Sequence, residues 1–234
     1  MILGSNGIKM GKRFPEFVVN PSDVVRDYGA DTLRLYEMFM GPLEVSKPWS
    51  DQGVEGARRF LNRVWAFFTE PENIVDGDVP ALEKIYHKSV KKISEDFEKL
   101  AFNTAISQMM IFVNAVYKEG KCPRAYAEGL IKMLSCICPH IGEEIWSILG
   151  HSDTIAYESW PTYDEAKTAD DSIEVAVQIN GKLRATVMLP MNCSKDEAIA
   201  IAKADERVSS AIEGKTIIKE ISVPNKIVNI VVKG

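Results

Sequence analysis

The hydrophobic residues of this 234-residue chain change their spacing near residue 171, and that change restricts the folds open to it. From Val54 to Leu149 they recur every three or four residues, which predicts amphipathic helices. From Ile173 to Leu189 they alternate with polar residues, which predicts strands with one buried face. We therefore expect a mainly α chain, with an antiparallel helical bundle followed by a small α+β domain whose sheet is covered by helices.

The helical part divides into four amphipathic stretches, at residues 54–68, 82–100, 106–116 and 124–149. Asn103 and Thr104 are candidate N-caps for the third stretch, because their side-chain oxygens can accept a hydrogen bond from a free backbone N–H group. Pro139 divides the fourth stretch, because proline disfavours a helical conformation at the residue before it. Trp65 and Trp146 fall on apolar stripes, so we expect both side chains to lie in the core.

Residues 151–170 follow neither pattern, and we interpret them as a linker between a bundle at 51–150 and a domain at 171–234. In that last domain the pattern predicts strands near 173–179, 183–189, 216–223 and 227–232, and helices at 195–204 and 206–213. Ser194 is the expected cap of the first of these helices. Together these elements make a small sheet with helical cover.

Asn180 and Gly181 separate two alternating runs and predict a β-hairpin. A plain two-residue loop would pair Val177 with Arg184 and place the apolar residues of the two strands on opposite faces. One extra loop residue restores the match by pairing Val177 with Leu183. We therefore predict a three-residue loop in which Gly181 forms a left-handed bulge.

Composition narrows the class of protein. With 46% hydrophobic and 26% charged residues the chain resembles globular proteins, and no apolar run reaches the roughly 20 residues of a membrane helix. Its four cysteines form no Cys-x-x-Cys pair, so neither a zinc site nor a disulfide framework is indicated. We find no signal peptide and expect a cytoplasmic monomer. The net charge is −5, yet residues 171–234 carry nine basic and eight acidic side chains, so nucleic acid stays a possible partner.

Three cations lie within five residues near the start of the chain, in the loop Lys9-Met10-Gly11-Lys12-Arg13. Alone, such a cluster is usually a solvated surface. Two stretches that follow strengthen it, Tyr28–Arg34 (YGADTLR) and Gly53–Ala57 (GVEGA). Together the three segments resemble class I aminoacyl-tRNA synthetases around their second ATP signature, the Lys-Met-Ser-Lys-Ser loop. The likeness is greatest to the bacterial leucyl enzymes.

The resemblance implies that this loop helps to activate leucine with ATP, which Mg²⁺ accompanies. Negative charge grows on the departing pyrophosphate, and a flexible ammonium group stabilises it. Lys12 matches the second lysine of the signature and would be the main pyrophosphate contact, with Lys9 assisting as a second catalytic residue. The ATP-binding loop would comprise Lys9, Met10, Gly11, Lys12 and Arg13. Gly11 and Arg13 replace two serines of the signature, which removes a hydroxyl group and adds a cation.

The resemblance also implies that the chain is about the last quarter of a leucine–tRNA ligase, whose catalytic domain residues 1–50 would complete. The Rossmann unit and the His-Ile-Gly-His motif of that domain have no counterpart here. Pro139–Gly142 is the nearest string, and we interpret it as packing and turn residues of the bundle. We therefore expect the chain alone to bind tRNA(Leu) without catalysing the reaction, and ATP and leucine to be bound only by the full-length enzyme.

Five basic side chains are candidates for tRNA contacts: Arg59, Arg63, Lys182, Arg184 and Lys226. The two from the first bundle helix project opposite its apolar stripe, where they can straddle a phosphate backbone or pair with acids such as Glu55. The other three lie on the predicted hairpin and in the last turn. The segment at 177–185 resembles the carboxy-terminal domain of bacterial leucyl-tRNA synthetases, which docks on the tRNA elbow.

Two alternatives stay open. The chain can come from a valyl, isoleucyl or methionyl synthetase, which share the loop and the bundle but typically end in other appendages. It can also be a free-standing, non-catalytic module that binds RNA or protein. The lysine pair at the start argues against a pure binding module, which has no use for a pyrophosphate contact.

Overall fold

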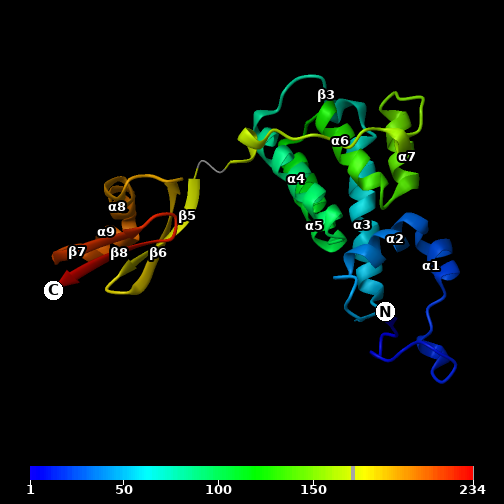
Figure 1. Ribbon diagram of the computed structural model, residues 1–234, viewed down its shortest axis with the longest axis horizontal. Helices are drawn as coiled ribbons and strands as arrows, with labels where there is room; N and C mark the ends of the chain where they lie inside the picture. Colours follow the sequence, from blue (N-terminus) through cyan, green and yellow to red (C-terminus); the bar gives the residue numbers. More distant parts are fainter. Residues whose placement is uncertain (170–171, 234) are drawn as a thin grey trace. The chain divides into compact units, whose positions relative to one another are not determined.

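The computed structural model describes residues 1–169 and 172–233, which form two compact units, Met1–Thr168 and Ala169–Gly234 (Figure 1). The first unit is helical, and the second is a four-stranded sheet with two helices. This confirms the predicted mainly α fold with a small α+β domain at its end. No helix in the described ranges has the length and apolar character needed to cross a membrane.

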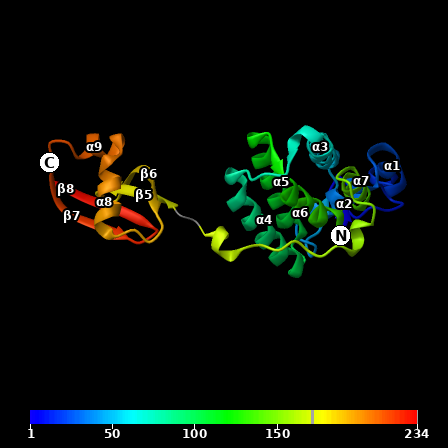
Figure 2. The ribbon, with the colours of Figure 1, turned by 90° about the horizontal axis from the view of Figure 1, so that it is seen from above.

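The described residues of the first unit form these α-helices: α1 (Pro21–Tyr28), α2 (Ala30–Phe39), α3 (Asp51–Phe68), α4 (Pro80–Glu98), α5 (Phe102–Glu119), α6 (Arg124–Ser135) and α7 (Pro139–Ile148). The four predicted helical stretches correspond to α3, α4, α5 and the pair α6–α7, which Pro139 separates as expected. α4 and α5 lie side by side in both views, as a three-residue connection requires (Figures 1 and 2).

Two pairs of very short parallel strands fasten loops that are distant in sequence. β1 (Ile2–Leu3) pairs with β2 (Lys47–Pro48), which ties the segment before α1 to the start of α3. β3 (Ile74–Val75) pairs with β4 (Cys122–Pro123), which ties the α3–α4 loop to the start of α6. Residues 1–50 therefore belong to the same compact unit as the bundle.

The core of the first unit is formed by the facing stripes of its helices, with Val64, Ile93 and Ile106 fully buried. Each such side chain stabilises the fold by about 1.5–3 kcal/mol relative to an exposed one. Trp146 is buried as predicted, with 2% exposure, but Trp65 is 42% exposed. The prediction for Trp65 is wrong because this side chain lies beside the core stripe of α3 and not on it.

The connection between α4 and α5 leaves no place for the predicted caps. Leu100 has a φ of +55° and reverses the chain directly after α4. Ala101 N then donates to Asp96 O at 2.8 Å and Leu100 N to Phe97 O at 3.1 Å, the two bonds of a Schellman motif. Because α5 starts at once at Phe102, the prediction that Asn103 or Thr104 caps it is wrong.

Residues 154–168, here called the strap, lie against the helices although the sequence suggested a linker. Trp160 Nε1 donates to Ser94 Oγ at 2.8 Å, and Asp164 N donates to His87 Nδ1 at 3.1 Å. Glu165 and Lys167 form ion pairs with Lys91 and Glu83 respectively. The four α4 partners lie three or four residues apart, so they form one face of that helix. The strap includes the 3₁₀ turns η3 (Ile155–Tyr157) and η4 (Glu165–Thr168).

The second unit is a sheet of strand order β6–β5–β8–β7, with β5 (Ser172–Ile179), β6 (Lys182–Pro190), β7 (Thr216–Val223) and β8 (Ile227–Lys233). β5 and β8 are parallel, and the two outer pairs are antiparallel. The helices α8 (Lys195–Ala204) and α9 (Glu206–Ile212) pack on one face, where Val175, Val177 and Val228 are buried (Figure 2). These elements match the predicted ones, and Ser194 Oγ caps α8 by accepting from Glu197 N at 3.2 Å.

The loop between β5 and β6 has two residues and not the three that were predicted. Asn180 and Gly181 have φ values of +52° and +76°, as a type I′ turn requires. Asn and Gly both tolerate positive φ, so this pair closes the hairpin without a further residue. The prediction of a left-handed bulge at Gly181 is therefore wrong.

The extra residue that the alternation requires is Arg184, which bulges from β6. Val177 pairs with Ala185 and the next residue of β5 pairs with Leu183, so Arg184 has no partner across the strands. The bulge returns the apolar residues of β6 to the helix-covered face, while Leu183 stays 63% exposed. The apolar residues of the two strands thus share one face as predicted, but the inserted residue lies in β6 and not in the loop.

Candidate nucleic-acid interface

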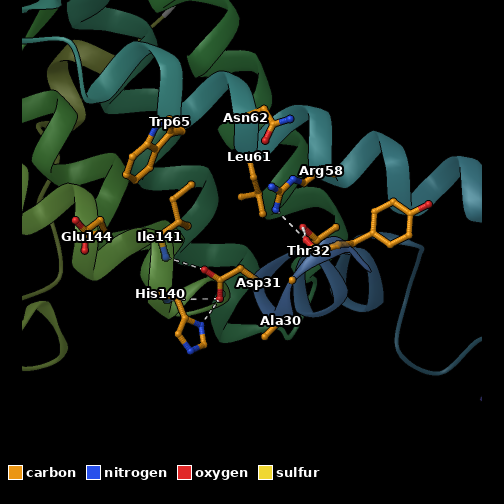
Figure 3. A pocket seen from close by; sticks show the side chains of 12 residues that line it. Ala30, Asp31, Thr32, Arg58, Leu61, Asn62, Trp65, His140, Ile141 and Glu144 are labelled. Atoms are coloured by element: carbon orange, nitrogen blue, oxygen red, sulfur yellow. Dashed lines mark hydrogen bonds and ion pairs between the residues drawn. The ribbon is translucent and has the colours of Figure 1, made fainter. Parts of the chain in front are cut away.

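A pocket of about 420 Å³ opens where α3 passes the α1–α2 junction and the start of α7 (Figure 3). α3 contributes Arg58, Asn62 and Trp65 to its wall, and α7 contributes His140 and Glu144. With Asp31 included, the pocket combines one guanidinium group, an amide, an imidazole, a half-exposed indole and two carboxylates. The guanidinium group can donate to an anionic oxygen, and the indole can pack on a flat ring.

Asp31 forms the floor of this pocket and joins α2 to α7. Its carboxylate accepts hydrogen bonds from Ile141 N at 2.7 Å and from His140 N at 3.4 Å, the free N–H groups of the first turn of α7. Asp31 Oδ1 also lies 2.9 Å from His140 Nδ1 (Figure 3). Pro139–Gly142 forms the first turn of α7, in which Gly142 is buried while His140 is exposed and lines the pocket. His140 has an acidic partner that the sequence did not suggest.

Arg58 is held at the edge of the pocket by the backbone between α1 and α2. Arg58 Nη1 donates to Tyr28 O at 2.9 Å, and the same oxygen accepts from Thr32 Oγ1 at 2.8 Å. Gly29 has a φ of +90°, which lets α2 begin directly after α1 and brings this carbonyl within reach of α3. A guanidinium group has five N–H donors, so this contact orients Arg58 and leaves donors for an anionic ligand.

Arg58, Asn62 and Trp65 line the pocket, and the sequence analysis did not identify them as candidate site residues. They are spaced i, i+4, i+7 on α3, which places them on one face of the helix, next to the core stripe through Leu61. The sequence signal for this surface is a polar stripe on α3 that contains a tryptophan and lies beside the apolar stripe. Assigning Trp65 to the apolar stripe hides this second stripe.

The Lys9–Arg13 loop is anchored by one side chain and otherwise exposed. Met10 packs against the core of the first unit, and its Sδ accepts from Val19 N at 3.4 Å. Phe14 N donates to Gly11 O at 3.1 Å and closes a turn around Lys12 and Arg13. The three cations form no ion pair with any residue that the structure describes. The geometry thus presents their charge to solvent.

Arg59 and Arg63 project from α3 as expected, but only one of them is loosely held. Arg59 Nη1 lies 3.8 Å from Glu55 Oε2 with a side chain that is 70% exposed. Arg63 is engaged with α5, where Nη1 donates to Asn114 Oδ1 at 2.9 Å and the guanidinium carbon lies 4.5 Å from the centre of the Tyr117 ring. Arg59 is therefore freer than Arg63 to meet a phosphate.

The second unit brings two of its three candidate cations together. Lys182 follows the hairpin loop and Arg184 is the bulge residue, so both exposed side chains lie at the same end of the sheet. Lys226 lies in the β7–β8 turn at the opposite end, beside Asn225, which is hydrogen-bonded to Asn192 in the turn after β6. The hairpin end and the Lys226 end are thus separate basic positions.

Thiol and metal chemistry find no support at the pocket. Cys138 lies next to it, and burial, assisted by the Asp31 carboxylate, raises the pKa of its thiol far above the ordinary range. A thiol in that state is not a nucleophile. Within the described parts of the chain, no three His, Cys, Asp or Glu side chains are grouped so that they could hold a metal ion.

Comparison with known proteins identifies the family. Residues 81–199, which extend from α4 into α8, match the family described as the anticodon-binding domain of tRNA ligase. The chain is also similar to the agnB2 leucyl-tRNA synthetase (LeuRS) of Agrobacterium radiobacter K84, whose structure was solved as a ternary complex with tRNA and LeuAMS. The two structures match with a TM-score of 0.76 and 29% sequence identity. That match covers 100% of this chain and 33% of the other, so the chain spans about a third of that synthetase. The chain belongs to the anticodon-binding domain family of aminoacyl-tRNA synthetases.

Proposed function

We propose that the chain is the tRNA-binding C-terminal part of a leucine–tRNA ligase and that its partner is tRNA(Leu). The observation that carries this proposal is the extent of the similarity to LeuRS, which includes the small α+β unit as well as the bundle. Bundles of this kind are shared by several synthetases, so the second unit is the feature that favours the leucyl type. We further propose that the protein works as a monomer in the cytoplasm.

In this proposal the pocket on α3 provides one tRNA contact. Arg58 supplies donors for a phosphate oxygen, and the half-exposed indole of Trp65 supplies a surface on which a base or sugar can pack. Arg59 extends the positive charge along the same helix. The hairpin cations Lys182 and Arg184 supply a second contact on the other unit.

The Lys9–Arg13 loop is the part of the chain that we expect to meet ATP in the full-length enzyme. Its exposed cations fit the charge of a nucleotide's phosphates, and Lys12 and Lys9 are the proposed pyrophosphate contacts. Mg²⁺ bound to ATP would neutralise further phosphate charge. Because residues 1–169 and 172–233 contain no Rossmann unit, we propose that the chain binds tRNA but does not form leucyl adenylate by itself.

The test is a salt titration of the purified chain with tRNA(Leu) and with an unrelated tRNA. We expect tighter binding to tRNA(Leu), weakening steeply as salt rises, because phosphate contacts release counterions. Arg58→Gln should reduce the slope of log K against log salt by about 1. Arg26→Gln is the matched control, since Arg26 is 67% exposed on α1 and is paired with Asp23 and Asp27.

The outcomes separate the parts of this proposal. Equal affinity for both tRNAs would remove leucine specificity from this chain and leave general tRNA binding. An equal loss of binding in Arg58→Gln and Arg26→Gln would show that binding depends on the overall positive charge. It would refute the role of the pocket as a tRNA contact. Absence of binding even at low salt would overturn the proposed function as a whole.

A further inference from the structure

Asn180 and Gly181 form the turn of the β5–β6 hairpin, and this dipeptide is chemically labile. Glycine has no Cβ, so its backbone nitrogen is the least hindered nucleophile for the side-chain amide of a preceding asparagine. The attack forms a bond from Gly181 N to Asn180 Cγ, breaks the Cγ–Nδ2 bond and releases ammonia. Water then opens the five-membered succinimide and leaves aspartate or isoaspartate.

The structure holds the electrophile of this reaction. Asn180 Nδ2 donates to Val232 O at 3.0 Å, and Asn180 Oδ1 accepts from Val232 N at 2.9 Å. The carboxamide thus takes the place of a strand partner for β8, and Asn180 N adds a third bond to Ile230 O at 3.0 Å. Attack at Cγ requires the side chain to leave both bonds to Val232.

The structure also holds the nucleophile. Gly181 N donates to Asn229 Oδ1 at 3.2 Å, and Asn229 belongs to β8, the same strand that binds the Asn180 side chain. The turn fixes φ at +52° for Asn180 and +76° for Gly181. Both reacting groups are therefore tied to one strand that is 48 or more residues away in sequence.

We propose that Asn180 is a latent deamidation site and that Asn229, with Val232, sets its rate by keeping the reacting groups apart. The reaction needs water and no enzyme, oxidant or metal. It starts when the end of β8 separates from the hairpin, so the modification records local opening of the sheet. The Asn180 side chain and Gly181 N are released together, because both are hydrogen-bonded to β8.

Conversion would change the hairpin end of the sheet in two ways. An aspartate at this position has no N–H to donate to Val232 O. One of its carboxylate oxygens would instead face that carbonyl oxygen, and both groups can only accept a hydrogen bond. It also adds a negative charge beside Lys182 and Arg184. If these cations bind tRNA, as the proposed function holds, conversion weakens that binding; the chemistry itself does not depend on tRNA.

The chain contains an internal reference, because Asn6 and Gly7 form a second Asn-Gly pair in an exposed loop. Asn6 Oδ1 accepts from Ile8 N at 3.0 Å, and Gly7 N donates to Gly4 O at 2.8 Å, so its contacts are confined to close neighbours in sequence. Substitutions at Asn229 should leave the Asn6 rate unchanged.

The test follows both sites by peptide mass spectrometry during incubation at mildly alkaline pH, for the whole chain folded and in urea. Asn229→Ala removes the side-chain oxygen that accepts from Gly181 N, whereas Asn229→Asp keeps an oxygen acceptor at this position. We expect slow conversion of Asn180 in the folded wild type and in Asn229→Asp. In Asn229→Ala we expect conversion about fivefold faster, the factor that one typical hydrogen bond contributes to an equilibrium.

Two results would overturn the proposal. One is conversion of Asn180 in the folded wild type as fast as in urea, which would show that the sheet gives no protection. The other is an equal rate in Asn229→Ala and Asn229→Asp. Circular dichroism checks that each variant is folded, and Asn229→Ser, whose hydroxyl is shorter, replaces Asn229→Ala if that variant does not fold. A loss of tRNA binding alone leaves these rates interpretable, so the two proposals fail separately.

Discussion

Asp31 and Arg34, one turn apart on α2, hold opposite sides of the corner between α6 and α7. The Asp31 carboxylate accepts from Ile141 N at 2.7 Å in the first turn of α7, and Arg34 Nε donates to Ile137 O at 2.6 Å, just after α6. Each group has the charge that the dipole of the helix end it meets favours. The Tyr28–Arg34 segment, which carried part of the family resemblance, is thus the piece that fixes this corner.

Replacing Asp31 by alanine should destabilise the first unit by about 1–2 kcal/mol, because two N–H groups at the start of α7 lose their acceptor. All four tryptophans of the chain lie before residue 169, so tryptophan fluorescence during urea unfolding reports on this unit. Asp23→Ala is the control, since this carboxylate is 55% exposed on α1. An unchanged midpoint in Asp31→Ala would contradict the capping role.

Two glycines inside helices should respond in opposite directions to alanine. A Cβ on Gly129 in α6 would lie 2.0 Å from Tyr86 Oη, so Gly129→Ala should destabilise the bundle by about 1–3 kcal/mol through overpacking. A Cβ on Gly56 in α3 meets nothing closer than 3.8 Å, and Gly56→Ala should stabilise by roughly 0.5–1 kcal/mol. Urea midpoints from tryptophan fluorescence check both signs. The same sign for both variants would show that packing at Gly129 does not decide the effect.

The contact between His87 and the strap should make the first unit less stable in acid. Burial, and secondly Lys167, lowers the pKa of His87 from its ordinary 6.5, while Glu83 and Asp164 oppose this shift. The unfolded chain therefore takes up the proton first. The stabilisation is complete above pH 6.5 and is lost as pH falls through the folded pKa.

His87→Asn keeps an acceptor for Asp164 N but does not titrate in this range. We expect the wild type to lose more stability than this variant when urea midpoints are compared between about pH 7.5 and pH 5. Parallel pH profiles for the two proteins would exclude His87 as the source of the loss.

The bulge at Arg184 should be dispensable for the pairing of β5 with β6. Deleting Arg184 makes Leu183 and Ala185 neighbours, and their partners Gln178 and Val177 are already neighbours in β5, so the ladder closes with its register unchanged. Arg184→Ala keeps the bulge and serves as the control. Amide hydrogen exchange should show protection of β5 and β6 in both variants. A loss of protection in the deletion alone would show that the sheet needs the bend at the bulge.

Local pattern was enough to predict most of the elements, because each is defined by neighbours within one or two turns. The boundaries of α8 were predicted with its Ser194 cap, and the break at Pro139 was predicted from one residue. The Asn103 cap failed because a Schellman motif at Leu100 had already ended the preceding helix. That motif has no glycine, the residue by which such ends are usually recognised.

The pocket could not be predicted, because its parts come together only in the folded chain. Asp31 meets Ile141 across 110 residues, and Arg58 meets Tyr28 across 30. Spacing within α3 could have shown that Arg58 and Trp65 share a face, but not that α7 closes the other side. The roles of Lys9, Lys12 and the five candidate tRNA contacts remain predictions that the binding experiments test.

The strap has a practical consequence for anyone who transplants these modules. Its contacts make the bundle longer in sequence than its helices suggest, since Glu83, His87 and Lys91 find their partners among residues 164–167. A chimaera joined directly after residue 150 would carry an α4 with a row of unmatched polar groups and an uncovered Phe97 ring, which now packs on Trp160. A chimaera joined after residue 168 would keep the strap, and with it the partners of these α4 side chains.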